Sequence, residues 1–195
     1  MKFPVRFCIP TLFFYTFSFG QFAVSGSLTG SYGKSENNYN FQEWYGDLNL
    51  HGNAWNGWLQ LEYSNPPELG RALKGIRKFR FEYIRPQFEL QVGDLYQFWG
   101  RGLVLNQFDN QPIDLDNSMR GIAVTGRWNR VTTMILGGTK DYWTSTNIVT
   151  QFDNRIPNYK THHSLLGGQV FFSGNQITIG TSILRDIEKH PIPFN

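Results

Sequence analysis

Apolar and polar residues alternate with a period of two along most of this chain. In 79–83, Phe-Arg-Phe-Glu-Tyr, the aromatic side chains fall on one face of an extended strand and the charged ones on the other. The segments 57–63, 88–92, 121–128 and 176–183 repeat the pattern. This is the period of a β-strand, and no stretch after residue 20 shows a convincing helical stripe. The sequence therefore predicts an all-β protein.

The alternating segments define nine predicted strands. They cover 24–33, 39–50, 54–64, 76–84, 88–98, 119–128, 131–140, 164–173 and 176–186. Most approach the ~9–11 residues that a tilted strand needs to cross a bilayer, whereas strands of ordinary globular proteins are nearer ~5–6 residues. Strand length therefore favours a sheet that crosses a membrane.

The connections between these strands alternate strictly between short and long. The short ones carry Gly, Pro or Asn, as hairpin turns do, at 51–53, 85–87, 129–130 and 174–175. The long ones are polar, at 34–38, 65–75, 99–118 and 141–163. Outer-membrane barrels have tight periplasmic turns and long external loops, whereas a β-sandwich has no reason to alternate in this way. We therefore predict an antiparallel up-and-down transmembrane β-barrel.

The first 20 residues have the pattern of a signal peptide. Lys2 and Arg6 precede an apolar run, 7–19, and Ser18-Phe19-Gly20 offers small residues for cleavage before Gln21. The run is shorter than the ~20 residues of a transmembrane helix. We expect export, with residues 21–195 forming the barrel.

Composition excludes several other classes of protein. Removal of residues 1–20 lowers the formal net charge from +3 to +1, so nothing indicates nucleic-acid binding. The single cysteine, Cys8, excludes a disulfide scaffold and a cysteine-based zinc site.

The number of strands raises the question of closure. Single-chain bacterial barrels have an even number of strands, and the segment 190–195 contains two prolines that prevent pairing as a closing strand. We therefore expect residues 21–195 to be the N-terminal portion of a larger barrel that is incomplete at its C-terminus.

Two motifs carry a resemblance to a known family. They are Leu-Gln-Val-Gly-Asp-Leu-Tyr-Gln-Phe-Trp-Gly-Arg-Gly-Leu-Val-Leu at 90–105 and Asp-Asn-Ser-Met-Arg-Gly at 116–121. Over about 76–138 the chain resembles long, uncharacterised, porin-like outer-membrane β-barrel proteins of diderm bacteria, which form a family of unknown function. The resemblance implies a barrel fold and an outer-membrane location. That family has no assigned reaction, so the resemblance implies no catalytic residue and no cofactor.

Charged residues on the polar faces of the strands are candidates for lining a pore, where they would set the electric field along it. The candidates are Asp47, Glu62, Lys78, Arg80, Glu82, Glu89, Arg101 and Arg127. Arg101 lies between two glycines, where we expect the strand to bend into the lumen. There it would pair with a carboxylate, tune anion selectivity, or do both. Charge pattern alone does not separate a barrel from a soluble sandwich, because each has one wet face.

Two loops suggest other chemistry. Oxygen-bearing side chains that could bind Ca²⁺ crowd one loop: Asp109, Asn110, Asp114, Asp116 and Asn117. Their spacing is not that of an EF-hand, and Asx-turns explain them, so we predict no metal. His162 and His163, with Asp153 nearby, would face opposite ways in an extended segment, and we favour an exposed loop role.

The function predicted is that of an outer-membrane β-barrel protein without catalysis, either a porin-like channel or a transport-associated or scaffold protein. Its expected partners are outer-membrane lipid, the barrel-assembly machinery during insertion, and a small solute, with no nucleic acid and no cofactor. The alternative is a secreted soluble β-sandwich or barrel that binds carbohydrate through aromatic residues such as Trp55, Trp58 and Trp143. A third possibility is a hydrolase at a barrel rim that uses His162 or His163.

Overall fold

The computed structural model describes residues 6–12, 17–19, 22–34, 40–67, 72–110, 115–144 and 159–189. These residues form antiparallel β-strands, turns and one short 3-10 helix, and no α-helix occurs among them. The chain divides into two compact units, and the division falls within one strand, between Phe79 and Arg80. The prediction of an all-β protein is confirmed.

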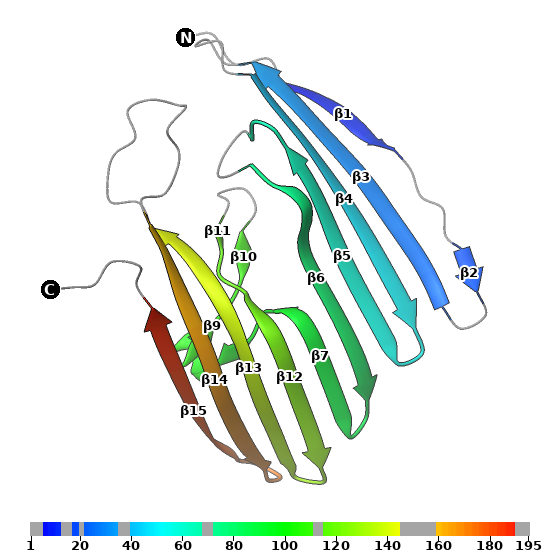
Figure 1. The fold of residues 1–195 in the computed structure, drawn as a ribbon. Helices are drawn as coiled ribbons and strands as arrows, with labels where there is room; N and C mark the ends of the chain where they lie inside the picture. The colour runs from blue at the N-terminus through cyan, green and yellow to red at the C-terminus, as the bar shows by residue number, and fades with distance from the viewer. Residues whose placement is uncertain are drawn as a thin grey trace, which may run out of the picture. The chain divides into compact units, whose positions relative to one another are not determined.

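Unit 1, which runs to Phe79, is an antiparallel sheet (Figure 1). Its strands are β1 (Arg6–Leu12), β2 (Phe17–Phe19), β3 (Phe22–Lys34), β4 (Asn40–Gly52), β5 (Trp55–Ser64) and the first half of β6 (Lys74–Arg85). The order is β1-β3-β4-β5, and β2 also pairs with β3.

Unit 2, from Arg80 onward, is a second run of neighbouring antiparallel strands. After the second half of β6 come β7 (Phe88–Leu95), β12 (Met119–Trp128), β13 (Val131–Thr144), β14 (Tyr159–Ser173) and β15 (Thr178–Lys189), which pair in that order. The segment between β7 and β12 forms two small pairs, shown in green in Figure 1. They are β8 (Phe98–Trp99) with β9 (Leu105–Asn106), joined by the 3-10 helix η1 (Gly100–Gly102), and β10 (Asp109–Asn110) with β11 (Leu115–Asp116).

Each of the nine predicted strands corresponds to one strand of the structure: β3 to β7 and β12 to β15. The ends differ by a few residues, and the largest difference is at β14, which begins at Tyr159 instead of 164. The strand predicted for 88–98 is shorter than expected, since β7 ends at Leu95. There the chain leaves the sheet and forms the small pair β8–β9.

The connections follow the predicted alternation. Four connections take only two to four residues: β4 to β5, β6 to β7, β12 to β13, and β14 to β15. The connections at 65–73, 96–118 and 145–158 are long. Because successive connections of an antiparallel meander lie at opposite ends of the strands, each unit has its short turns at one end and its long connections at the other.

The strand order is open. Among the described residues, no pairing joins β15 to β1, so no closed barrel is found, and the prediction of a barrel is supported only as far as an antiparallel sheet. Two strands lie within the predicted signal peptide, β1 (Arg6–Leu12) and β2 (Phe17–Phe19), and both pair with β3. Export of the chain stays a prediction.

The pairing register gives unit 1 one polar and one apolar face. Ser27, Asp47 and Gln60 form one row across β3, β4 and β5, and the next polar row contains Tyr45 and Glu62. The intervening rows, on the other face, are apolar and include Leu28, Leu48, Leu59, Leu61, Trp44 and Tyr63. The period of two in the sequence is therefore the alternation of these two faces.

The burial of these faces is the reverse of that in an ordinary soluble domain. Glu62 is 6% exposed and Lys78 is 2% exposed, whereas Leu28 and Leu48 are 48% and 46% exposed. In unit 2, Ile135 is 59% exposed. Charged residues are rarely buried in proteins unless they are paired, and contiguous exposed apolar surface normally marks a contact with something else.

Unit 2 contains the main apolar cluster on its less exposed face. It comprises Leu95, Trp99, Leu105, Met119, Ala123, Met134 and Leu136, with Leu165 and Leu184 packed against it. Trp99 and Leu105 belong to β8 and β9, so the small pair covers this face of β12, β13 and β14. The opposite face exposes Ile122, Val124, Trp128, Ile135, Leu166, Val170, Phe172, Ile179 and Ile183.

Candidate functional site

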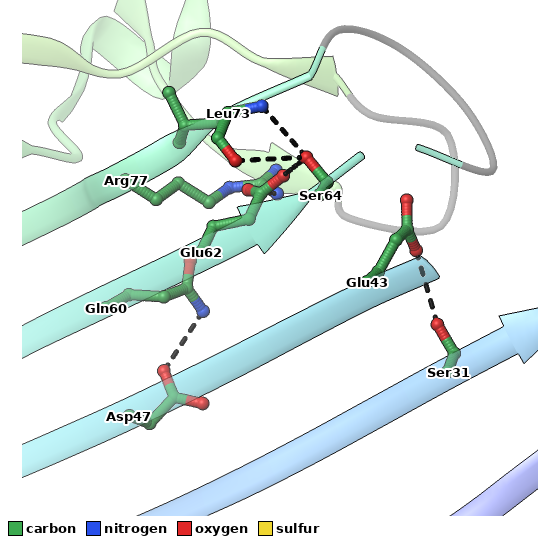
Figure 2. Close-up of polar contacts among 8 residues, drawn as sticks. All are labelled: Ser31, Glu43, Asp47, Gln60, Glu62, Ser64, Leu73 and Arg77. Carbon is green, nitrogen blue, oxygen red and sulfur yellow. Dashed lines mark hydrogen bonds and ion pairs between the residues drawn. The ribbon is translucent and has the colours of Figure 1, made fainter. Parts of the chain in front are cut away.

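The polar face of unit 1 holds three separate groups of hydrogen-bonded polar side chains (Figure 2). The Gln60 amide donates a hydrogen bond to Asp47 Oδ1 at 3.0 Å. Between β3 and β4, the Ser31 hydroxyl donates a hydrogen bond to Glu43 Oε2 at 3.4 Å. Both contacts join residues that lie directly opposite each other on neighbouring strands, so the register of β3, β4 and β5 positions them.

Glu62 is the centre of the most buried polar group in unit 1. It accepts a hydrogen bond from the Ser64 hydroxyl at 2.8 Å and forms an ion pair with Arg77 at 2.7 Å. Ser64 Oγ in turn accepts a hydrogen bond from the Leu73 backbone N–H at 2.9 Å (Figure 2). The guanidinium of Arg77 also lies 5.7 Å from the centre of the Tyr45 ring. The carboxylate of Glu62 is therefore buried with its charge balanced and its oxygens hydrogen-bonded, which is how a buried charge is tolerated.

In unit 2 the predicted charges also form ion pairs, one within β6 and one between β7 and β12. Arg80 contacts Glu82, with Nε 2.7 Å from Oε1, and Arg127 forms an ion pair with Glu89. The Gln91 amide donates to Glu89 at 2.8 Å and to Glu82 at 3.3 Å, so it bridges the two carboxylates. Apart from Arg101, the charged candidates of unit 2 therefore form one hydrogen-bonded group on β6, β7 and β12.

Residues 96–108 form a hairpin that folds back over this unit; we call it hairpin 96–108. Its base is closed by two hydrogen bonds between Gln97 and Gln107, at 3.0 and 3.1 Å. The Gln97 side chain then donates to Gln91 Oε1 at 2.7 Å. A chain of three glutamines thus connects the hairpin to the polar group of β7.

Trp99 fastens the hairpin to the sheet. It is 1% exposed and belongs to the apolar cluster of unit 2. A Cβ added to Gly167 of β14 would lie 2.9 Å from Cζ3 of Trp99, so the indole lies close over a position where a larger residue would collide. Glycine at 167 therefore leaves the space that the indole fills.

Arg101 lies at the tip of hairpin 96–108 and is exposed. The chain turns at this position as predicted, and the direction of the bend into a lumen stays a prediction. The carboxylate partner is not found: Arg101 forms no ion pair with any residue that the structure describes.

The aspartate- and asparagine-rich loop is explained by turn structure in its described part. The Ser118 backbone N–H donates to Asp116 Oδ1 at 2.8 Å, as in an Asx-turn, and the Asn117 amide donates to the Asn106 carbonyl at 2.8 Å. Asp114 lies outside the described residues. No group of three or more His, Cys, Asp or Glu side chains in the described ranges is arranged to hold a metal ion.

The two adjacent histidines contact different carboxylates. His162 Nδ1 is 2.7 Å from Asp141, and His163 Nδ1 is 2.9 Å from Asp186. His163 also lies 3.6 Å from Glu188 and edge-on to the Tyr142 ring. Both histidines lie within β14 and not in a loop as predicted, and their imidazoles contact carboxylates of the neighbouring strands β13 and β15. Asp153 and the side chain of Trp143 lie outside what the structure describes.

Several residues of these groups could not be predicted from the sequence. Arg77 lies next to Lys78, where strict alternation assigns it to the opposite face, yet its long side chain reaches Glu62. Gln97 falls at the end of the predicted strand 88–98, and Trp99 falls at the start of the predicted loop 99–118. The available signal was the loss of clean alternation from Leu95 to Trp99, where apolar residues become nearly continuous.

In each unit the strands present one exposed aliphatic face and one less exposed face that carries the paired charges, and in unit 2 this second face also holds the apolar cluster. The chain matches a family of unknown function, DUF6029, over residues 23–191, and it belongs to that family. The expected resemblance to a family without an assigned function is confirmed and extends well beyond 76–138, but the description of the family says nothing of an outer-membrane barrel. No curated protein and no solved structure matches the chain. In the described ranges, no helix has the length and hydropathy needed to cross a membrane.

Proposed function

We propose that the protein is an outer-membrane β-barrel protein of a diderm bacterium, exported by its N-terminal segment. In this proposal the strands cross the membrane with the aliphatic face of each unit toward lipid and the polar face toward water. Its role is that of a porin-like channel, or of a transport-associated or scaffold protein, and it carries out no catalysis.

The observation that carries the proposal is the reversed burial of the two faces. Four residues on the aliphatic face of unit 2 are 52% to 76% exposed: Ile122, Ile135, Leu166 and Ile183. Isolated exposed apolar residues are ordinary, but a continuous aliphatic face over four neighbouring strands would be poorly solvated in water. Lipid covers such a face without any further protein layer, and barrel strands alternate apolar-out and polar-in for this reason.

Aromatic side chains near strand ends give further support. Tyr32, Trp44 and Tyr63 share the apolar face of unit 1 and lie toward the end of the strands that carries the long connections. Trp128, 61% exposed, lies at the turn end of unit 2. Aromatic residues gather at both membrane interfaces of barrels, where their rings contact lipid and their polar atoms contact water.

A porin-like role is supported by the polar faces. Their charges are of both signs and mostly paired, as in the Glu62–Arg77 and Arg127–Glu89 pairs. Such a surface is wettable and offers fixed charges to a passing solute, which is what selects ions in a pore. The proposed partners are outer-membrane lipid, the assembly machinery during insertion, and a small solute.

The test is to express the complete protein, isolate outer membranes and compare its gel mobility with and without boiling. We expect a membrane-resident band that changes mobility on heating, because a closed barrel resists detergent until it is heated. A soluble periplasmic or secreted product with no mobility change would contradict the proposal. It would favour the soluble β-sandwich or barrel, whose aliphatic face would then need a second protein layer, and sugar-binding assays would follow.

A further inference from the structure

Within the described part of the chain, Arg101 differs from the other candidate pore-lining charges because its guanidinium forms neither an ion pair nor a side-chain hydrogen bond. Five of the eight candidates are neutralised in ion pairs: Glu62 with Arg77, Arg80 with Glu82, and Arg127 with Glu89. Asp47 accepts a hydrogen bond from Gln60, and Lys78 is buried and has an interaction partner. Arg101 is exposed and forms no ion pair within the described part of the chain.

The backbone conformation at Arg101 indicates that the arginine side chain has a functional role at this position. Gly100, Arg101 and Gly102 have φ values of 59°, 57° and 84°, all in the left-handed region. This conformation is unfavourable for an L-residue with a Cβ, and Gly or Asn would adopt it more readily. Unfavourable backbone conformations concentrate at functional sites, and a local cost of this kind is a reason to look for a role of the side chain.

The tip that carries Arg101 is held in place from both sides of its base. Trp99 and Leu105, which flank the tip and pair with each other, are 1% and 8% exposed in the apolar cluster of unit 2. Below them, the Gln97–Gln107 hydrogen bonds and the Gln97–Gln91 contact fix the hairpin to β7. The guanidinium therefore stands on an anchored support and not on a free loop.

The geometry points to Arg101 as a binding point for small anions, placed by hairpin 96–108 over the water-facing side of unit 2. This inference rests on the proposed channel, because the hairpin narrows the water-filled space only if that side lines a pore. An uncompensated guanidinium at a narrowing attracts anions and repels cations, and nearby paired charges contribute little net field. We therefore assign an anion preference to the pore and place its origin at Arg101.

The experiment measures the chloride-to-potassium permeability ratio of the complete protein in planar bilayers under a KCl gradient. A unit charge about 5 Å from the ion path, with water between them, changes the permeability of each ion by roughly fourfold, in opposite directions for chloride and potassium, so the ratio changes by roughly 16-fold. We expect Arg101→Gly to lower the ratio by about that factor, Arg101→Glu to lower it further, and Arg101→Lys to keep it. Arg101→Gly is the main variant because glycine relieves the backbone at this position.

Arg130 provides the matched control. It is an exposed arginine in the turn between β12 and β13, away from the hairpin, so Arg130→Gln should leave the ratio unchanged. Heat-modifiable gel mobility of each variant confirms that it is assembled. A conducting Arg101→Gly variant with the wild-type ratio would overturn the anion site and leave the proposed channel standing. A heat-modifiable protein that conducts no ions would overturn both the channel and the anion site.

Discussion

Replacement of Trp99 by alanine tests whether hairpin 96–108 is packed on the sheet as described. A tryptophan side chain buries about 200 Å², and at about 25 cal/mol per Å² its burial contributes at most ~5 kcal/mol. Core Trp→Ala substitutions cost about 3–5 kcal/mol. Because Trp99 is 1% exposed and contacts the cluster from the hairpin, most of this loss should destabilise the docked hairpin.

The assay is limited trypsin digestion of the folded protein in detergent. Trypsin cleaves after Arg101, but a peptide bond must open locally before it fits a protease, so the cleavage rate follows the population of the open hairpin. A loss of ~3 kcal/mol raises that population by roughly a hundredfold. We expect Trp99→Ala to release the fragment that begins at Gly102 about a hundred times faster than the wild type.

Two controls make this prediction specific. Trp128 has the same side chain but lies 61% exposed on the apolar face of β12, so Trp128→Ala should leave cleavage at Arg101 unchanged. Arg101→Gln should abolish the fragment, which identifies the bond that is cut. If Trp99→Ala is cleaved no faster than the wild type, or if the wild type is already cleaved at once, the hairpin is not held by the indole.

Three further predictions concern the sheet itself. Gly167→Val adds atoms where a Cβ alone would lie 2.9 Å from the Trp99 ring, so the same Gly102 fragment should appear faster than in the wild type; unchanged cleavage would place the indole elsewhere. Glu62→Ala leaves the part-buried Arg77 without its carboxylate and should lower the free energy of unfolding in urea by about 3–5 kcal/mol; a loss below ~1 kcal/mol would mean that the pair is effectively solvated. Ile135 is 59% exposed on the aliphatic face, so Ile135→Lys places a charge there and should lower the free energy of unfolding in lipid vesicles by ~2–4 kcal/mol. An unchanged free energy of unfolding would argue against lipid contact at this face.

The strands could be predicted from sequence because their signal is local. Alternation of aromatic and charged residues, as in 79–83, defines a strand whichever way its faces point, and turn residues such as Asn129 define where it ends. All nine predicted strands occur, and most ends lie within a few residues of the prediction. Most of the charged candidates were also found correctly on the polar faces, since side chains two apart on a strand share a face.

The sidedness of the sheet required the three-dimensional structure. Alternation places Lys78 and Glu62 on one face and Leu28 and Leu48 on the other. A soluble sandwich would show the same sequence pattern with the opposite burial. Only the paired sheet shows that the charged side chains are buried and the leucines exposed. Burial depends on what lies above each face, and residues distant in sequence determine that.

By itself, the sequence determined the class of fold, nine of the strands and the alternation of short turns with long connections, because each of these follows from interactions between residues close along the chain. Tertiary structure decided which partners the charges have and how hairpin 96–108 is placed. The Arg77–Glu62 pair joins two different strands, and the Trp99 indole rests over Gly167, far along the chain. Such contacts depend on the register of neighbouring strands and on the space left at a glycine, and neither has a local signature in the sequence.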